Sequence, residues 1–123
     1  MNPLLLALAV AAAPSAETPK PLALPGSPGS VMMDYLAVEP SPARVWVPAG
    51  NTGKVDVVDV ATLAITSVTG FPTVTKEGPH GKREVGPSSV TIGDGHAFVG
   101  NRANNQVCAI ELKTLKLGAC VPL

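Results

Sequence analysis

The chain has few of the residue types that usually carry recognition or catalysis. Its 123 residues include two cysteines, two histidines, one Trp, one Tyr and two Phe. Nine Lys and Arg residues balance nine Asp and Glu residues, so the formal net charge at pH 7 is zero. A neutral chain lacks the basic footprint that nucleic acid or an anionic membrane requires, and we expect neither as a partner.

Proline and glycine, by contrast, are abundant. Thirteen prolines and twelve glycines interrupt a chain whose apolar residues are mostly Val, Ala and Leu. This composition favours many short strands joined by tight turns and argues against long helices. We therefore expect an all-β fold.

The N-terminal segment differs from the rest. The run from Leu4 to Ala13 is apolar but too short to cross a bilayer as a helix, and Ala16 is a plausible cleavage point. We interpret residues 1–16 as a signal peptide and expect a periplasmic or secreted protein without a stable membrane span. The alternative is a buried strand or helix of a cytosolic protein. Residues 17–33, rich in Pro, Gly and Ser, are expected to form an extended lead-in strand.

A repeat appears when the sequence is shifted along itself by 52 residues without a gap. Val47 then falls on Val99, Val55 on Val107, and Thr62-Leu63 on Thr114-Leu115; Trp46 falls on Phe98. The loop residue Gly53 falls on Asn105, and these are the two residue types that tolerate a positive φ best. The repeat indicates two similar units, at 34–70 and 87–123.

Each unit is predicted to contain four short strands separated by turn-forming residues. In the first unit we expect them at Tyr35–Val38, Val45–Val47, Val55–Val60 and Ile65–Val68; in the second at Ser88–Ile92, Ala97–Val99, Val107–Leu112 and Lys116–Val121. Four-stranded units in tandem are typical of propeller blades.

The segments RVWVPAGNTGKVDVVDVATLAI and HAFVGNRANNQVCAIELKTLKL resemble the YVTN-type, YncE-like β-propeller repeat. The likeness extends from about Met33 to Val121, and it departs from the pattern where Leu63 and Leu115 replace the usual turn glycine. It implies two blades of four antiparallel strands, and hence an incomplete propeller, because such rings close with about four to eight blades.

Two further expectations follow from that count. The segment Pro21–Gly26 resembles the N-terminal strand that completes the last blade in closed propellers of this kind. We expect either a truncated copy or a two-blade protomer that closes its ring by oligomerising. In both cases open blade faces and edges favour self-association.

Both cysteines fall in the second unit. Cys108 and Cys120 are equidistant from Thr114, so a hairpin turning there places them opposite each other or one step off register. In an oxidising compartment we expect a disulfide, with twist or a bulge closing the small excess distance. Free buried thiols are the alternative. Two thiols without a nearby His make only half a zinc site, so we expect no metal there.

Residues 71–86 lengthen the repeat beyond a usual blade and are predicted to form an exposed hairpin. Its charged side chains are the candidate partner-binding residues: Lys76, Glu77, His80, Lys82 and Arg83. The alternative is a solvated loop without a partner.

A second candidate group, Asp34, Tyr35 and Ser88, starts the innermost strand of each unit, near the mouth of a propeller channel. A turn-capping role is the alternative for Asp34. His80 and His96 lack a partner at motif spacing and are expected to be exposed loop residues.

No motif predicts a catalytic, cofactor or metal site. We therefore expect an exported binding or scaffold module that is not an enzyme and uses no cofactor. Its partner is an unspecified protein or small ligand. The alternative is a fragment of a propeller enzyme, lactonase-like or quinoprotein-like, whose site requires further blades.

Overall fold

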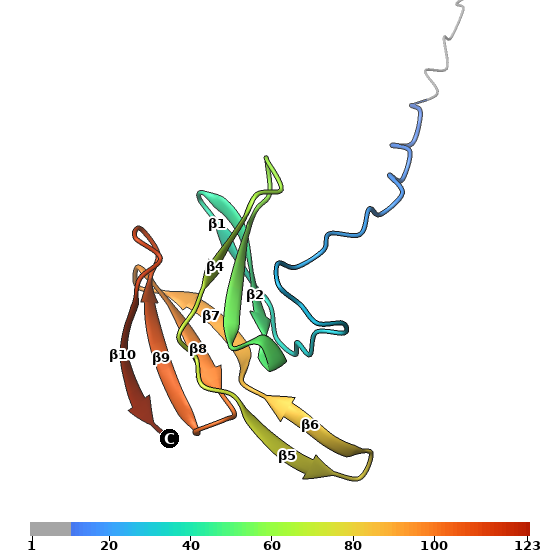
Figure 1. Ribbon diagram of the computed structural model, residues 1–123. Coiled ribbons are helices and arrows are strands. Elements are labelled where there is room, and N and C mark those ends of the chain that lie inside the picture. The colour runs from blue at the N-terminus through green and yellow to red at the C-terminus, as the bar shows by residue number, and fades with distance from the viewer. Residues whose placement is uncertain (1–10) are drawn as a thin grey trace, which may run out of the picture.

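The computed structural model describes residues 11–123, and its regular structure is β throughout apart from one short 3-10 turn. The predicted all-β class is confirmed. Two four-stranded antiparallel sheets lie side by side, and a two-stranded hairpin extends beyond their lower end (Figure 1). The prediction for residues 1–16 falls mainly outside the described residues; residues 11–16 are exposed and have no regular structure.

The first sheet has the order β1-β2-β3-β4, so each strand pairs with its neighbour in the chain. Its strands are β1 (Ala37–Pro40), β2 (Ala43–Ala49), β3 (Lys54–Asp59) and β4 (Ile65–Val68), with the 3-10 turn η1 (Gly50–Thr52) between β2 and β3. The second sheet has the same meander, β7-β8-β9-β10. Its strands are β7 (Pro87–Gly93), β8 (His96–Asn101), β9 (Gln106–Glu111) and β10 (Leu117–Pro122).

The loops of the two units adopt matching backbone conformations. Gly53 and Asn105 both have positive φ, 68° and 53°, as their residue types predict. Leu63 and Leu115, which replace the turn glycine, also have positive φ, 60° and 56°. A leucine in this region costs about 1–2 kcal/mol, so both turns carry the same local strain.

The register of the ladders places alternate residues on opposite faces of each sheet. We call one face of the first sheet, with Val38, Val45, Val47 and Val58, its leading face, and the opposite face, with Trp46, Val55 and Val57, its trailing face. By the same repeat positions, the leading face of the second sheet carries Val90, Ala97, Val99 and Ile110. Its trailing face carries Phe98, Val107 and Ala109.

The hydrophobic core lies between the trailing face of the first sheet and the leading face of the second. Trp46, Val55, Val99 and Ile110 are fully buried there, and Phe71, from the segment between the sheets, is 5% exposed. The two units therefore share one core, and neither four-stranded sheet buries its apolar face alone.

The innermost strand of the first sheet begins later than predicted. We expected Tyr35 to start it, but β1 begins at Ala37. Tyr35 instead forms a parallel bridge with the second sheet: its amide donates to the Ser88 carbonyl (3.1 Å) and its carbonyl accepts from Val90 (3.1 Å). Its backbone groups are therefore not available to β2.

The lead-in does not form the expected strand. Residues 17–33 contain no strand and pair with no ladder among the described residues. The lead-in instead crosses the leading face of the first sheet. Leu22, Leu24 and Met33 border a hollow of about 300 Å³ over Val45, Val47 and Val58.

Candidate functional site: a groove between the two sheets

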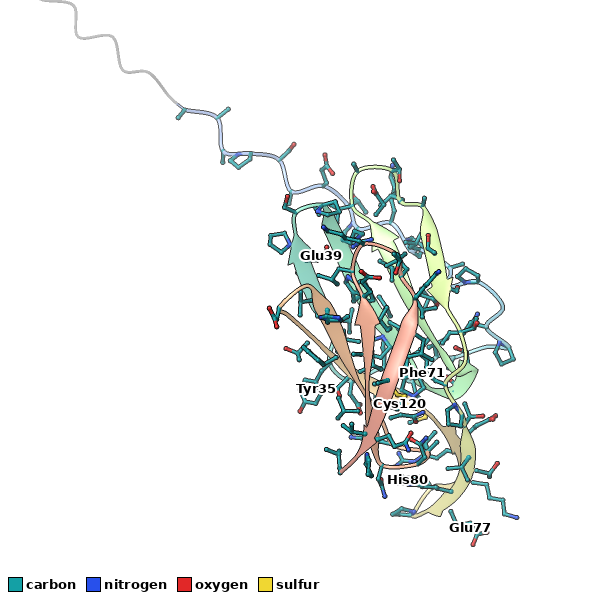
Figure 2. All side chains as sticks on the ribbon, turned by 90° about the vertical axis from the view of Figure 1, so that its left-hand side faces the viewer. Tyr35, Glu39, Phe71, Glu77, His80 and Cys120 are labelled. Carbon is teal, nitrogen blue, oxygen red and sulfur yellow. A yellow bond between two sulfur atoms is a disulfide. The ribbon has the colours of Figure 1, made fainter. Side chains whose placement is uncertain are left out.

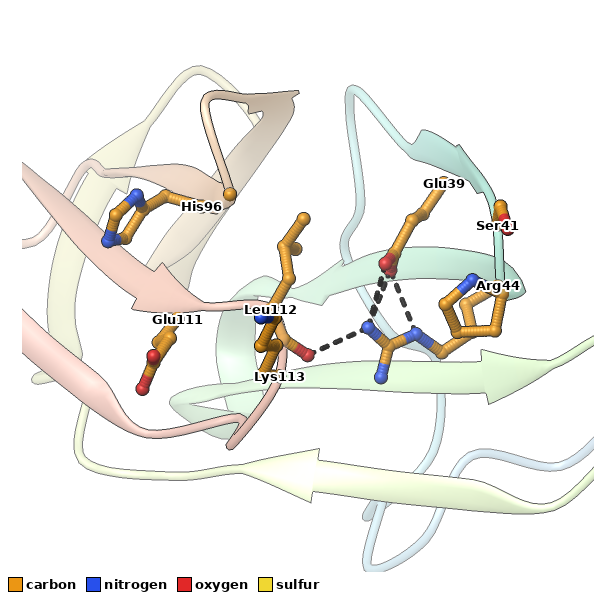
Figure 3. A pocket seen from close by; sticks show the side chains of 9 residues that line it. Glu39, Ser41, Arg44, His96, Glu111, Leu112 and Lys113 are labelled. Atoms are coloured by element: carbon orange, nitrogen blue, oxygen red, sulfur yellow. Dashed lines mark hydrogen bonds and ion pairs between the residues drawn. The ribbon is translucent and has the colours of Figure 1, made fainter.

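A groove of about 610 Å³ lies at one end of the molecule, between the two sheets (Figure 3). The β1–β2 turn and β2 form one wall, and the start of β8 and the β9–β10 turn form the other. The lining residues are Glu39, Ser41, Pro42, Arg44, Gly95, His96, Glu111, Leu112 and Lys113. Both repeat units contribute, so the groove exists only in the assembled pair.

A buried ion pair closes the floor of the groove. Arg44 donates from Nε to Glu39 Oε2 (2.8 Å) and from Nη2 to Glu39 Oε1 (2.9 Å). The same Nη2 reaches across to the second sheet and donates to the Leu112 carbonyl (2.8 Å). Since bidentate guanidinium–carboxylate contacts fix geometry, this pair holds the two walls in one arrangement.

Trp46 supports the ion pair from the core side. Its indole Nε1 donates to Glu39 Oε2 (3.0 Å), and the Arg44 guanidinium lies 5.6 Å from the centre of the indole ring. Glu39 is only 4% exposed. Burial alone would raise the pKa of Glu39, but the hydrogen bonds from Arg44 and Trp46 and the charge of Arg44 outweigh it, and the pKa lies below its ordinary value.

The groove also offers polar groups that are not engaged by the ion pair. Arg44 Nη1 donates no hydrogen bond to any residue within 11–123. On the opposite wall, His96 Nδ1 lies 2.7 Å from the Asp94 carbonyl, and Glu111 accepts from Thr114 Oγ1 (2.6 Å). Lys113 is exposed at the rim. The groove can therefore bind a ligand through a guanidinium donor, an ammonium group and a carboxylate.

The predicted channel-mouth residues do come together, but around a contact between the sheets. Tyr35 is joined to Ser88 through the backbone, and Asp34 forms an ion pair with Arg102 (3.0 Å). The cavity beside them has about 20 Å³, room for about one water molecule. These residues connect the two units and leave no space for a larger ligand.

The predicted hairpin forms between the sheets, with β5 (Val74–Gly78) paired to β6 (Gly81–Val85) and Pro79-His80 at its tip. Lys76 donates to the Arg102 carbonyl (2.8 Å), and Lys82 lies 3.8 Å from Glu77. All five candidate side chains, those of Lys76, Glu77, His80, Lys82 and Arg83, are exposed. Glu77 and His80 lie at the opposite end of the molecule from Glu39 (Figure 2), so the hairpin does not border the groove.

The disulfide between Cys108 and Cys120 is present, and the two residues are direct cross-strand partners with their Cα atoms 4.0 Å apart. A register shift between Leu117 and Cys120 produces this alignment. Counted from the turn, Leu117 pairs with Ile110, so an unbroken ladder would bring Ala119 opposite Cys108. The extra residue of the bulge moves Cys120 into that place.

The groove was not predictable from any motif in the sequence. EPSPAR, residues 39–44, was interpreted only as a turn, although its two ends carry opposite charges and a Trp follows two residues later. Antiparallel pairing across that turn brings Glu39 opposite Arg44. The charged ends of a tight turn are therefore a signal that could have predicted the ion pair, but not the contact with Leu112.

Comparison with known proteins does not extend this description: no family model, curated protein or solved structure matches the chain. Within residues 11–123, no three His, Cys, Asp or Glu side chains gather as metal ligands. The described part of the chain also contains no helix with the length and apolarity needed to cross a membrane.

Proposed function

We propose that the chain is an exported repeat module of the YVTN-type β-propeller kind and that its activity is binding, in the groove between its two sheets. The observation that carries the proposal is the groove itself, whose volume of about 610 Å³ lies within the range of small-ligand sites. The Arg44–Glu39 pair holds its walls before any ligand arrives. The disulfide supports export, since such bonds persist mainly in oxidising compartments.

The chemistry of the groove favours a ligand with a carboxylate. Arg44 Nη1 has no hydrogen-bond partner among the described residues, and the exposed Lys113 adds a positive charge at the rim. A planar acceptor matches a guanidinium edge, as in arginine–carboxylate pairs generally. Glu111 on the opposite wall suits a donor on the same ligand, so an amino acid or a peptide end fits better than a simple dianion.

The test uses a panel of free amino acids and short peptides, with amide NMR shifts of the chain as the readout. We expect shifts at Gly95, His96 and Lys113. Lys113→Trp, which narrows the groove from its exposed rim, should weaken binding at least tenfold. Lys82→Trp, on the hairpin, is the matched control and should leave binding unchanged.

Two outcomes would contradict the groove assignment. If the panel causes no shifts at millimolar concentration, the groove does not bind this class of ligand. If the shifts fall on residues 74–85, binding belongs to the exposed hairpin that was first proposed from its charge.

A further inference from the structure

We infer that the chain assembles head to tail with further copies of itself, the trailing face of the second sheet in one copy receiving the leading face of the first sheet in the next. This interaction surface is separate from the groove and independent of what the groove binds. The argument starts from the contact inside the molecule, where the same two types of face already meet.

Each copy contains one completed contact between sheets and, at its two ends, one leading and one trailing face that no other sheet of residues 11–123 covers. Inside the chain, the trailing face of the first sheet packs against the leading face of the second. Among residues 11–123, no sheet lies against the trailing face of the second sheet: Phe98 is 36% exposed and Val121 is 56% exposed. At the other end, Val38 on the leading face of the first sheet is 68% exposed.

The two outer faces carry apolar residues at several of the places that form the completed contact, although Asp56 on the leading face of the first sheet occupies the place of Cys108. On the leading faces, Val38, Val47 and Val58 of the first sheet occupy the places of Val90, Val99 and Ile110 in the second. On the trailing faces, Phe98 and Val107 occupy the places of Trp46 and Val55. A second copy can therefore repeat the internal contact with apolar residues at the equivalent places.

This pairing joins a trailing face to a leading face, so it is heterologous. Each copy in a pair therefore keeps one face that is not paired with another copy. A pair of copies still has one unpaired trailing face and one unpaired leading face, so it can add further copies. Repetition of a fixed rotation closes into a ring, as blades do in a propeller, when the rotation divides a full turn, and otherwise extends as a filament. An isologous dimer, in which identical faces meet, would stop at two copies.

The lead-in regulates this assembly by occupying one of the faces. Leu22, Leu24 and Met33 lie over Val45, Val47 and Val58 on the leading face of the first sheet, and Lys54 Nζ donates to the Pro25 carbonyl. Val47 and Val58 are 6% and 8% exposed as a result. An incoming sheet must displace this cover, so the lead-in and the second copy compete for the same apolar surface.

The test is sedimentation velocity of the purified full chain between about 1 and 200 µM. The wild type should associate with increasing concentration. Phe98→Asp blocks the trailing face and Val38→Asp blocks the leading face, and each should weaken association at least tenfold, because an unpaired charge cannot be buried against apolar side chains. Val74→Asp, an exposed apolar position on the hairpin, should associate like the wild type.

The mixture of the two blocked variants is decisive. Phe98→Asp leaves the leading face unaltered and Val38→Asp leaves the trailing face unaltered, so an equimolar mixture should form a species of twice the monomer mass and nothing larger. Recovery also shows that both variants are folded; circular dichroism of each alone provides the same control. Folded variants that remain monomeric when mixed would overturn the proposal.

Two other results would also contradict head-to-tail assembly. One is a wild type that stays monomeric over the whole concentration range. The other is a Val38→Asp variant that associates normally, which would indicate pairing of identical trailing faces. The double variant Leu22→Ser, Leu24→Ser should associate at least threefold more tightly, because the cover is weakened. Weaker association of this variant would show that the lead-in belongs to the interface and does not compete with it.

Discussion

Trp46 and Phe98 occupy the same place in the two units, yet Trp46 is completely buried and Phe98 is 36% exposed. One pair on the leading faces shows the reverse: Val38 is 68% exposed and its equivalent Val90 only 6%, whereas Val47 and Val58 are covered by the lead-in. The strands, turns and registers of the two sheets correspond closely. What differs is whether another sheet lies against the face concerned, so burial in this protein is a property of the neighbour and not of the repeat.

A second difference concerns the cross-strand pair between the last two strands of each sheet. In the first sheet, Ser67 donates to Asp56 across the ladder, and both residues are direct partners. The equivalent of Asp56 is Cys108, whose partner is Cys120. One unit thus has a covalent bond where the other has a hydrogen bond to a buried carboxylate. Its second oxygen, Asp56 Oδ2, has no partner among the described residues.

The largest effect should come from truncating the buried member of the aromatic pair. Trp46→Ala should lower the free energy of unfolding by about 4 kcal/mol, through a cavity in the shared core. Phe98→Ala should lower it by less than about 1 kcal/mol, as for most partly exposed positions. Urea titration followed by circular dichroism measures both, because Trp46 is the chain's single Trp and its variant has no indole fluorescence. Equal losses would refute the comparison.

The disulfide should have the next largest effect. Replacing both Cys108 and Cys120 by Ala should lower the free energy of unfolding by about 3 kcal/mol, since the unfolded chain loses a closed loop. The wild type in a thiol reductant should show the same loss without a substitution. Mass spectrometry after alkylation without reductant should find neither thiol labelled in exported protein. Two labelled thiols would contradict the bond.

Glu39 provides a test of the ion pair that only the first unit contains. Glu39→Gln should lower the free energy of unfolding at pH 7 by about 2 kcal/mol, the usual range for hydrogen bonds to a charged group. The equivalent Thr91→Ala should change it by less than about 0.5 kcal/mol. Thermal or urea unfolding of both variants at one pH suffices.

The lowered pKa of Glu39 predicts that the free energy of unfolding decreases as the pH falls. The pKa of Glu39 is lowered in the folded state, so its contribution is present above the unfolded value of 4.5 and is lost as the pH falls through the lower folded value. Asp59 acts in the same direction, since the Thr62 amide and hydroxyl lower its pKa. The wild type should lose stability below about pH 4.5, and Glu39→Gln should lose less over that interval. Parallel pH curves for the two proteins would exclude this role.

Ser67 should have a smaller effect. Ser67→Ala removes the one hydrogen bond of the buried Asp56 side chain and should lower the free energy of unfolding by about 1.5 kcal/mol. The double variant Asp56→Val, Ser67→Val removes the unpartnered oxygen as well and should return close to the wild type. If the double variant is less stable than Ser67→Ala, Asp56 has a favourable partner that the fold does not show.

The smallest effect should come from the two strained turns. Leu63→Gly should raise the free energy of unfolding by up to about 1 kcal/mol, because glycine adopts the positive φ without strain. Leu115→Gly should give less or nothing, because Leu115 packs against the core while Leu63 is 55% exposed. Equal gains would show that the packing of Leu115 contributes nothing.

Several local features were predictable because they depend on residues close in the chain. Thr62 and Thr114 each donate to an acidic residue three positions earlier, Asp59 and Glu111, and so build the same turn in both units. The positive φ of Gly53 and Asn105 follows from residue type. The cysteine pairing follows from symmetry about the turn. The sequence did not decide whether Cys120 lies opposite Cys108 or one residue off register, and the bulge in β10 decides this.

The groove could not be predicted to the same extent. The pairing of Glu39 with Arg44 is a local consequence of the β1–β2 turn. The bond from Arg44 to the Leu112 carbonyl, by contrast, joins residues 68 positions apart. The hairpin was predicted, but the anchoring of Lys76 on the Arg102 carbonyl was not. Such contacts depend on the placement of one sheet against the other, which no local pattern specifies.

The sequence alone determined the β class, the two equivalent meanders, their turns and the cysteine pair, because alternation, turn residues and repeat spacing act over a few residues at a time. Tertiary structure alone decided which face of each sheet is buried, where the lead-in lies and where the groove forms. Both faces of each sheet carry apolar residues, so the alternation of apolar and polar residues cannot predict which face is buried. What lies against each face decides its burial, a second sheet in the core and the lead-in over the leading face of the first sheet, because contact with either removes apolar surface from water.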